Sequence, residues 1–344
     1  MTNWFPSLFF RPSVWTQMKN GGRSLQCHLD VNGVILGQET IGGKITPTEE
    51  YASIILANGT DGKWGECQKS QSYKTYVWEY LHPGPNSSSQ LRETRKQALK
   101  QFVRTLSTDR HPLAQSVEAQ YQQIISLLDP SPIFPGFPHL IRTLQTNHIS
   151  HNFIFRTFAE DGERVKKYLE EQFPNMVLQQ ASFDQDAGFH YQKGNKEIVT
   201  KDRNEFSKLI KTGHWLIKDN FERWRTNQEQ GNYGKLFPFS SDPQDPVLSI
   251  FADDNLEFVA SGEERTIVCC YDTATQKLVN TQQASPHLIK INPVKAVLEQ
   301  DYLTTRVSQA AEQLLNASRS RIPFLKIAVV AAVLIASLLA YAYD

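Results

Sequence analysis

The chain has 344 residues, 40% of them hydrophobic, which is enough for a folded domain with a buried core and excludes disorder throughout. Its 36 Lys and Arg balance its 36 Asp and Glu, so no overall charge attracts the chain to nucleic acid. The 4 cysteines show no Cys-x-x-Cys spacing, which argues against a disulfide framework or a zinc site and favours a reducing compartment.

The first strong pattern along the chain is SLQCHLDVNGVIL, an apolar run that predicts a buried strand with Asp30 at its carboxyl end. The next, ITPTEEYASIILANG, predicts a helix, because Thr46 and Glu49 have the spacing of a capping box. Further helical patterns follow until the proline-rich stretch 130–138. We therefore expect a mostly helical insert or cap over residues 38–138.

Strand and helix patterns alternate beyond the proline-rich stretch. FIFRTF predicts a strand, GFHYQKGNKEIVT predicts a hairpin or flap, and PVLSIFADD predicts a second buried strand. Strands separated by helices are typical of an α/β fold with a parallel sheet. We expect a discontinuous core from residues 20–37 and 139–300, followed by a polar linker helix over 301–322.

The last part of the sequence is strongly apolar. Residues 327–343 carry no charge and would span roughly 26 Å as a helix, which predicts a single-pass transmembrane anchor over 323–343. Arg319, Arg321 and Lys326 precede this span, so the positive-inside rule places the main domain on the cytosolic side of the membrane. A buried terminal helix of the core is the other interpretation. The first residues lack the features of a secretory signal peptide.

Carboxylates follow both of the buried strands. Asp30 ends the first, and Asp253 and Asp254 end the second. If both strands lie centrally in one parallel sheet, their carboxyl ends converge, and three carboxylates together require a cation. Hard oxygen ligands of this kind suit Mg²⁺ better than zinc. Each aspartate taken singly is also compatible with a solvated loop or a helix N-cap.

Four short segments in order along the chain contain residues suited to one chemistry. HLDVNGVIL provides Asp30, FIFRTF ends in a strand threonine at Thr157, GNYGKLFPF offers Lys235, and SIFADDN provides the acidic pair. Lys218 is a weaker candidate for the basic residue. In this order, over about residues 25–260, the segments resemble the four motifs of the haloacid dehalogenase (HAD) superfamily of aspartate-nucleophile phosphatases and phosphotransferases.

This resemblance implies an α/β Rossmannoid HAD-like core and a covalent mechanism. Asp30 would attack a phosphoryl group and become an aspartyl phosphate. Thr157 and Lys235 would contact the phosphoryl oxygens; otherwise Thr157 caps the next helix and Lys235 is a solvated loop lysine. The Mg²⁺ site that the resemblance implies consists of Asp30, the backbone carbonyl of Asn32, and one or both of Asp253 and Asp254.

Asn32 departs from the family pattern, which usually has a second aspartate there. An amide cannot protonate the leaving oxygen or activate water, and loss of such a group typically lowers the rate by about 10²–10⁴. A slow phosphatase, a phosphotransferase acting on good leaving groups, and a non-catalytic phosphate-binding fold remain open, whereas the acidic pair argues against dehalogenation. We expect a membrane-anchored phosphoric-ester hydrolase or phosphotransferase acting on a phosphorylated small molecule or protein, or else an inactive module that binds phosphate or a protein partner at a membrane.

Overall fold

The computed structural model describes residues 12–41, 44–84 and 88–320. The expected transmembrane anchor at 323–343 lies outside the described residues. Among the helices of the described part, none is both long enough and apolar enough to cross a bilayer.

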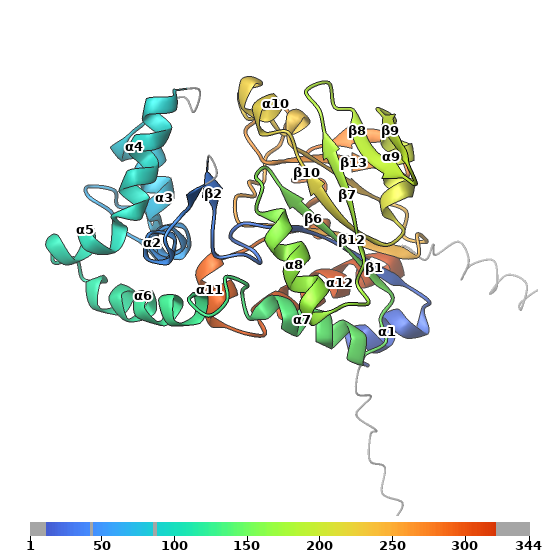
Figure 1. The fold of residues 1–344 in the computed structure, drawn as a ribbon, viewed down its shortest axis with the longest axis horizontal. Coiled ribbons are helices and arrows are strands. Elements are labelled where there is room, and N and C mark those ends of the chain that lie inside the picture. Colours follow the sequence, from blue (N-terminus) through green and yellow to red (C-terminus); the bar gives the residue numbers. More distant parts are fainter. Residues whose placement is uncertain (1–11, 42–43, 85–87, 321–344) are drawn as a thin grey trace, which may run out of the picture.

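A large, mostly parallel sheet forms the centre of the described chain, which confirms the expected α/β class (Figure 1). Within the described residues, this sheet has eight strands in the order β15-β12-β1-β6-β10-β7-β8-β9. Neighbours from β15 to β7 run parallel, and β8 and β9 continue the sheet as an antiparallel hairpin. The strands are β1 (Ser24–Asp30), β6 (His151–Thr157), β7 (Leu178–Phe183), β8 (Phe189–Lys193), β9 (Lys196–Thr200), β10 (His214–Lys218), β12 (Val247–Asp253) and β15 (Leu288–Lys290).

The register of the three central strands brings their carboxyl ends to one edge of the sheet. Leu29 of β1 pairs with Phe155 of β6 on one side and with Ala252 of β12 on the other. Both faces of these strands are covered, and their residues are almost all buried, as expected for a parallel sheet. The residues that come after these paired positions in the three strands therefore lie together at the carboxyl edge of the sheet.

The order of strands on the other side of β6 differs from the chain order. The chain passes from β6 through helix α8 (Gly162–Gln172) to β7, makes the hairpin β8–β9, and returns through helix α9 (Arg203–Ile210) to β10. Strand β10 lies between β6 and β7 in the sheet. In the sequence, however, β7 comes before β10. The hairpin expected from GFHYQKGNKEIVT is confirmed and belongs to the main sheet.

Residues 40–128, between β1 and α7, form a group of helices at one end of the molecule, beside the sheet (Figure 1). Two short two-stranded ladders accompany them. The elements are β2 (Thr40–Ile41), β3 (Lys44–Ile45), α2 (Thr48–Gly59), β4 (Asp61–Gly62), β5 (Gln71–Ser72), α3 (Tyr73–Tyr76), a π-helical turn (Val77–Leu81), α4 (Ser89–Lys100), α5 (Phe102–Thr108) and α6 (Ala114–Leu128).

The capping box expected at the start of α2 is wrong. The helix begins at Thr48 with Pro47 as its N-cap, and no side chain caps it. The backbone N–H of Thr46, which Glu49 would have to accept in a capping box, instead donates to the carbonyl oxygen of Glu39 at 2.9 Å. The backbone N–H of Thr46 is therefore already used by Glu39 and is not available to the Glu49 side chain.

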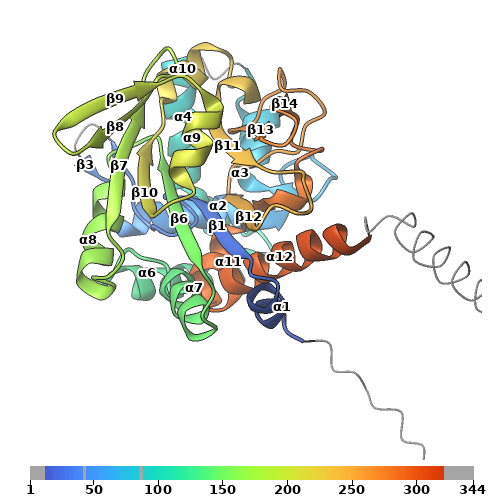
Figure 2. The same ribbon diagram turned by 90° about the vertical axis from the view of Figure 1, so that its right-hand side faces the viewer.

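Helices α1 (Val14–Asn20), α7 (Gly136–Thr146), α11 (Pro293–Leu298) and α12 (Tyr302–Ser320) gather beneath the central strands (Figure 2). The segment expected as a polar linker helix is α12, which has a polar face and an apolar one. Leu303, Val307 and Ala311 on the apolar face are buried in the same core cluster as residues of β1 and β6. Helix α12 is therefore part of the folded core.

A second, three-stranded sheet packs near the end of β12. It consists of β11 (Lys235–Phe239), β13 (Val268–Asp272) and β14 (Lys277–Val279), and β11 runs parallel to β13. Cys269 and Cys270 are buried in β13. Helix α10 (Phe221–Thr226) and the loop after it connect β10 to this sheet, which fixes the position of the first residue of β11.

Candidate active site

The predicted convergence of three carboxylates is confirmed. Asp30 and Asp253 are the last residues of the adjacent strands β1 and β12, and Asp254 follows directly. One carboxylate oxygen from each of the three residues lies within 4.8 Å of the others. The side chains of Asp30 and Asp253 are buried, and Asp254 is partly exposed. The acidic cluster therefore opens at the edge of the sheet where parallel α/β folds bind ligands.

Lys235 lies between two members of this cluster. Its Nζ is 2.5 Å from Asp30 Oδ1 and 2.9 Å from Asp253 Oδ2, and its side chain is 1% exposed. Lys235 begins β11, and its backbone N–H donates to Ile267 O, which fixes the start of that strand. Lys218, the weaker candidate, instead pairs with Glu160 at the surface, where it is half exposed. The structure thus selects Lys235 and removes its interpretation as a solvated loop lysine.

The charges of the cluster do not balance. With all three carboxylates ionised, the cluster exceeds the Lys235 ammonium by two negative charges, and the nearby Lys74 ammonium offsets part of this excess. Burial, then the Asp253 carboxylate, raises the pKa of Asp30 well above its ordinary value, and Lys235 opposes this shift. Burial also raises the pKa of Asp254 to about 7. Burial by itself would lower the pKa of Lys235, but Asp253 and Asp30 outweigh it and the pKa is raised.

The atoms of this cluster that could bind a metal ion fit a hard divalent cation. All of the ligand atoms are carboxylate or amide oxygens, and the three carboxylates outnumber the neighbouring cations Lys235 and Lys74, which suits one such ion. Gly33 has φ +82°, and a Cβ there would stand 2.7 Å from the Asp254 carboxyl carbon, so only glycine lets the backbone approach this ligand. Asn32 Oδ1 is buried and receives no hydrogen bond from any residue that the structure describes. Mg²⁺ is one member of the class of ions that would fit.

Asn32 contacts a carboxylate that the sequence did not single out as part of the site. Its Nδ2 donates to Asp161 Oδ2 at 3.0 Å, and Asp161 is fully buried at the start of α8. No spacing in the sequence marks Asp161 as part of the site, because the contact joins residues 129 positions apart. The pair fixes the orientation of the amide, which has no titratable group to offer for acid–base chemistry at neutral pH.

Thr157 ends β6 at the same edge of the sheet and is buried. Its Oγ1 accepts a hydrogen bond from Ala159 N at 3.0 Å, so the hydroxyl stabilises the turn after the strand. It does not cap α8, whose N-cap is Asp161. Arg156, one residue earlier, points to another partner: its Nε and NH2 groups donate to Asp219 at 2.9 and 2.5 Å, and NH1 donates to Leu236 O. This buried ion pair joins β6 to β10 and β11.

Two further residues reach the site from the helical insert. Tyr51 of α2 is buried, and its pKa is raised well above its ordinary value by burial and then by nearby carboxylates, Asp254 and Asp30 among them. Lys74 of α3 donates from Nζ to Asn255 Oδ1, beside Asp254. Burial lowers the pKa of Lys74, and the Asp254 carboxylate opposes this shift. No spacing in the sequence marks either residue, because only the packing of the insert brings them to the site.

Comparison of the chain with protein-family models, with curated proteins and with solved structures finds no match. The HAD resemblance therefore depends on the four segments of this sequence and on how the fold arranges them.

Proposed function

We propose that this protein is a HAD-like phosphatase or phosphotransferase that depends on Mg²⁺ and uses Asp30 as its nucleophile. The observation that carries the proposal is the Lys235 ammonium between Asp30 and Asp253, with Asp254 beside them, at the carboxyl edge of a parallel sheet. The four segments occur in the family's order, and all reach this edge. In this proposal the substrate is a phosphorylated small molecule or protein, and residues 323–343 attach the enzyme to a membrane with its main domain facing the cytosol.

Each protein group has a definite task in this mechanism. Lys235 holds Asp30 Oδ1, so we assign Oδ2 as the atom that attacks phosphorus. The bond from phosphorus to the leaving oxygen breaks as the aspartyl phosphate forms, and water or an acceptor hydroxyl then displaces Asp30. Lys235 favours the ionised form of Asp30, because it opposes burial and Asp253, which raise the pKa of that carboxyl. Asp30, Asn32, Asp253 and Asp254 would hold Mg²⁺, which supplies charge neutralisation between nucleophile and phosphate.

The surroundings of the nucleophile limit the choice of leaving group. Asn32 cannot protonate an alkoxide, and its amide is committed to Asp161. Good leaving groups, such as acyl phosphates and aryl phosphates, need no proton as they depart. We therefore propose that the protein transfers phosphoryl groups from such compounds faster than it hydrolyses alkyl phosphates.

The same observation favours one alternative function. A site that retains its cation ligands but lacks an acid is also suited to bind a phosphorylated molecule or partner without turnover. In this second candidate the residues 323–343 would display an inactive HAD-like module on a membrane. Metal binding is common to both candidates, whereas an aspartyl phosphate forms only in the first.

The test measures turnover and beryllium fluoride binding by the full chain, kept in mild detergent. The protein is incubated with Mg²⁺ and p-nitrophenyl phosphate, and then with Mg²⁺ and beryllium fluoride, which mimics an aspartyl phosphate. We expect release of p-nitrophenol from wild type, none from Asp30→Asn, and the wild-type rate from Asp129→Asn, an exposed aspartate at the end of α6. A wild-type protein that binds Mg²⁺ but neither turns over nor takes beryllium fluoride would leave only the binding module.

A further inference from the structure

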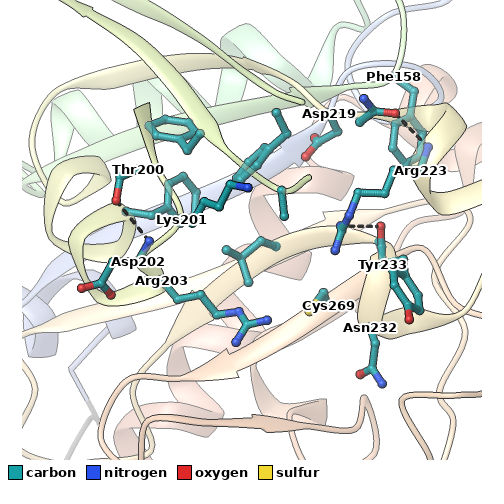
Figure 3. A pocket seen from close by; sticks show the side chains of 17 residues that line it. Phe158, Thr200, Lys201, Asp202, Arg203, Asp219, Arg223, Asn232, Tyr233 and Cys269 are labelled. Carbon is teal, nitrogen blue, oxygen red and sulfur yellow. Dashed lines mark hydrogen bonds between the residues drawn. The ribbon is translucent and has the colours of Figure 1, made fainter. Parts of the chain in front are cut away.

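A second candidate site lies next to the proposed catalytic centre. It is a cavity of about 60 Å³ between the ends of β6, β9 and β10 and the start of β11 (Figure 3). Phe158 joins the two sites, because its ring lines the cavity and lies 5.0 Å from Lys235 Nζ. The proposed reaction assigns no task to this cavity.

Three cationic side chains from different elements extend into this space (Figure 3). Lys201 follows β9, Arg203 begins α9, and Arg223 belongs to α10. The Arg223 guanidinium lies 5.2 Å from the Tyr233 ring centroid and donates to Tyr233 O at 3.3 Å. The Arg203 guanidinium lies 5.9 Å from the Tyr271 ring centroid. Aromatic rings thus hold both guanidinium groups in place without neutralising them.

The carboxylates near this cavity offset only part of its positive charge, because Lys201, Arg203 and Arg223 outnumber Asp202 and Asp219 in the lining. Asp219 is engaged by both donors of the buried Arg156. Asp202 accepts the backbone N–H of Asn204, and Lys201 forms a long ion pair of 3.9 Å with the exposed Asp186. Within the described parts of the chain, neither Arg203 nor Arg223 has a carboxylate partner at ion-pair distance. The cavity therefore has a surplus of positive charge beside an acidic centre.

The remaining wall and the size of the cavity indicate what it would hold. Phe158, Phe183, Phe189 and Phe206 add apolar, aromatic surface to the lining of the cavity. The volume is far below the roughly 300–1,000 Å³ of pockets that enclose a drug-sized ligand. Forked guanidinium groups match the geometry of planar or tetrahedral oxyanions. A small group with negatively charged oxygens fits this combination of charge, shape and size.

We propose that this cavity binds a single oxyanion group, a phosphate or a carboxylate, held by Arg203 and Arg223 with Lys201 at the entrance. The site would recognise an anionic group other than the one that reacts at Asp30, carried by the same molecule or by a separate one. It does not depend on the proposed reaction, because no residue that holds the anion takes part in phosphoryl transfer.

The test is calorimetric titration of the full chain in detergent, at low ionic strength and with EDTA. Without a metal ion, the acidic cluster repels anions, so anion binding reports on the cavity. Sodium phosphate and sodium benzoate are the two probes. We expect wild type and Asp30→Asn to bind at least one of them, and Arg203→Gln and Arg223→Gln to bind it about tenfold or more weakly, as expected for loss of one charge-assisted hydrogen-bond donor group. Arg225→Gln should behave as wild type, because Arg225 lies on the same helix but pairs with Glu222 outside the cavity.

The two probes separate the sources of the anion. Binding of phosphate alone would assign the site to a phosphoryl group, and binding of both would extend it to organic acids with an aromatic body. Absence of binding for both probes up to about 10 mM, weaker than the millimolar range, would overturn the proposal. Unchanged affinity in both arginine variants would also overturn it. Because Arg203 is exposed, its replacement tests the site even if Arg223→Gln folds poorly.

Discussion

The side-chain amide of Asn32 donates a hydrogen bond to Asp161 Oδ2 at 3.0 Å. Because Asp161 is fully buried, an aspartate at position 32 would bring two carboxyl groups together, and one of them would have to hold a proton. The local arrangement is thus adapted to an amide at position 32 as long as position 161 is acidic.

The first prediction exchanges the two groups. The double variant Asn32→Asp with Asp161→Asn keeps one donor and one acceptor in this contact and places an acid two residues after the nucleophile. We expect the rate of alkyl phosphate hydrolysis to rise by about 10²–10⁴, the usual contribution of general acid–base catalysis. Steady-state kinetics measure this, with Asp161→Asn alone as control. A double variant that melts like wild type but gains no rate would contradict the proposed role of position 32.

The second prediction concerns Lys235. Its ammonium is the only cation within hydrogen-bond distance of Asp30 and Asp253 among the described residues. Lys235→Met should lower the free energy of unfolding by about 3–5 kcal/mol in EDTA, because two buried carboxylates lose their partner. Urea denaturation measures this change, and added Mg²⁺ should recover part of it. For Lys218→Met, which removes an exposed ion pair, we expect a free energy of unfolding close to that of wild type.

The third prediction is a pH dependence without metal. Burial raises the pKa of Asp254 to about 7 from 3.8, so between these values the native carboxyl holds a proton that the unfolded chain has lost. The free energy of unfolding therefore falls as pH rises across this window, by an amount of the order of 2–4 kcal/mol. Melting curves in EDTA at pH 5 and pH 8 should show the fall for wild type. The fall should be smaller for Asp254→Asn, and equal slopes in both proteins would refute the assignment.

The fourth prediction compares two glycines with positive φ. Gly33 has φ +82° and leaves no room for a Cβ beside Asp254, whereas Gly194 has φ +62° and open space around it. Alanine at either position should destabilise the fold by about 1–2 kcal/mol through backbone strain. Gly33→Ala alone should also weaken Mg²⁺ binding about 10–100-fold, because it displaces a ligand. Calorimetric titration with Mg²⁺ distinguishes the two variants, and equal affinities would argue against a metal ligand at Asp254.

The strand-end carboxylates were predictable from the sequence because their placement follows from a general property of parallel sheets. Asp30 and Asp253 end buried apolar runs, and the carboxyl ends of neighbouring parallel strands share an edge. Lys235 was predictable as a candidate from the order of the segments, but only its position at the start of β11 separates it from Lys218.

The contributions of the helical insert were not predictable. Lys74 contacts Asn255, and Tyr51 is close enough to Asp254 and Asp30 for their charges to affect its pKa, but a helical period does not specify which neighbour a helix will have. The position of β10 between β6 and β7 could not be predicted from the sequence either, since periodicity describes single strands and not their order in a sheet. One local pattern gave a wrong prediction. The capping box of Thr46 and Glu49 does not form, because the backbone N–H of Thr46 donates to the carbonyl oxygen of Glu39.

The central position of β1 has a consequence for how the chain is made. This strand is synthesised early, yet its neighbours β6 and β12 begin only at His151 and Val247. During translation, the apolar Ser24–Asp30 segment must therefore wait for most of the chain to leave the ribosome before its hydrogen bonds are complete. An unpaired apolar strand is prone to aggregation, so newly made chains that stop before β12 should depend strongly on chaperones.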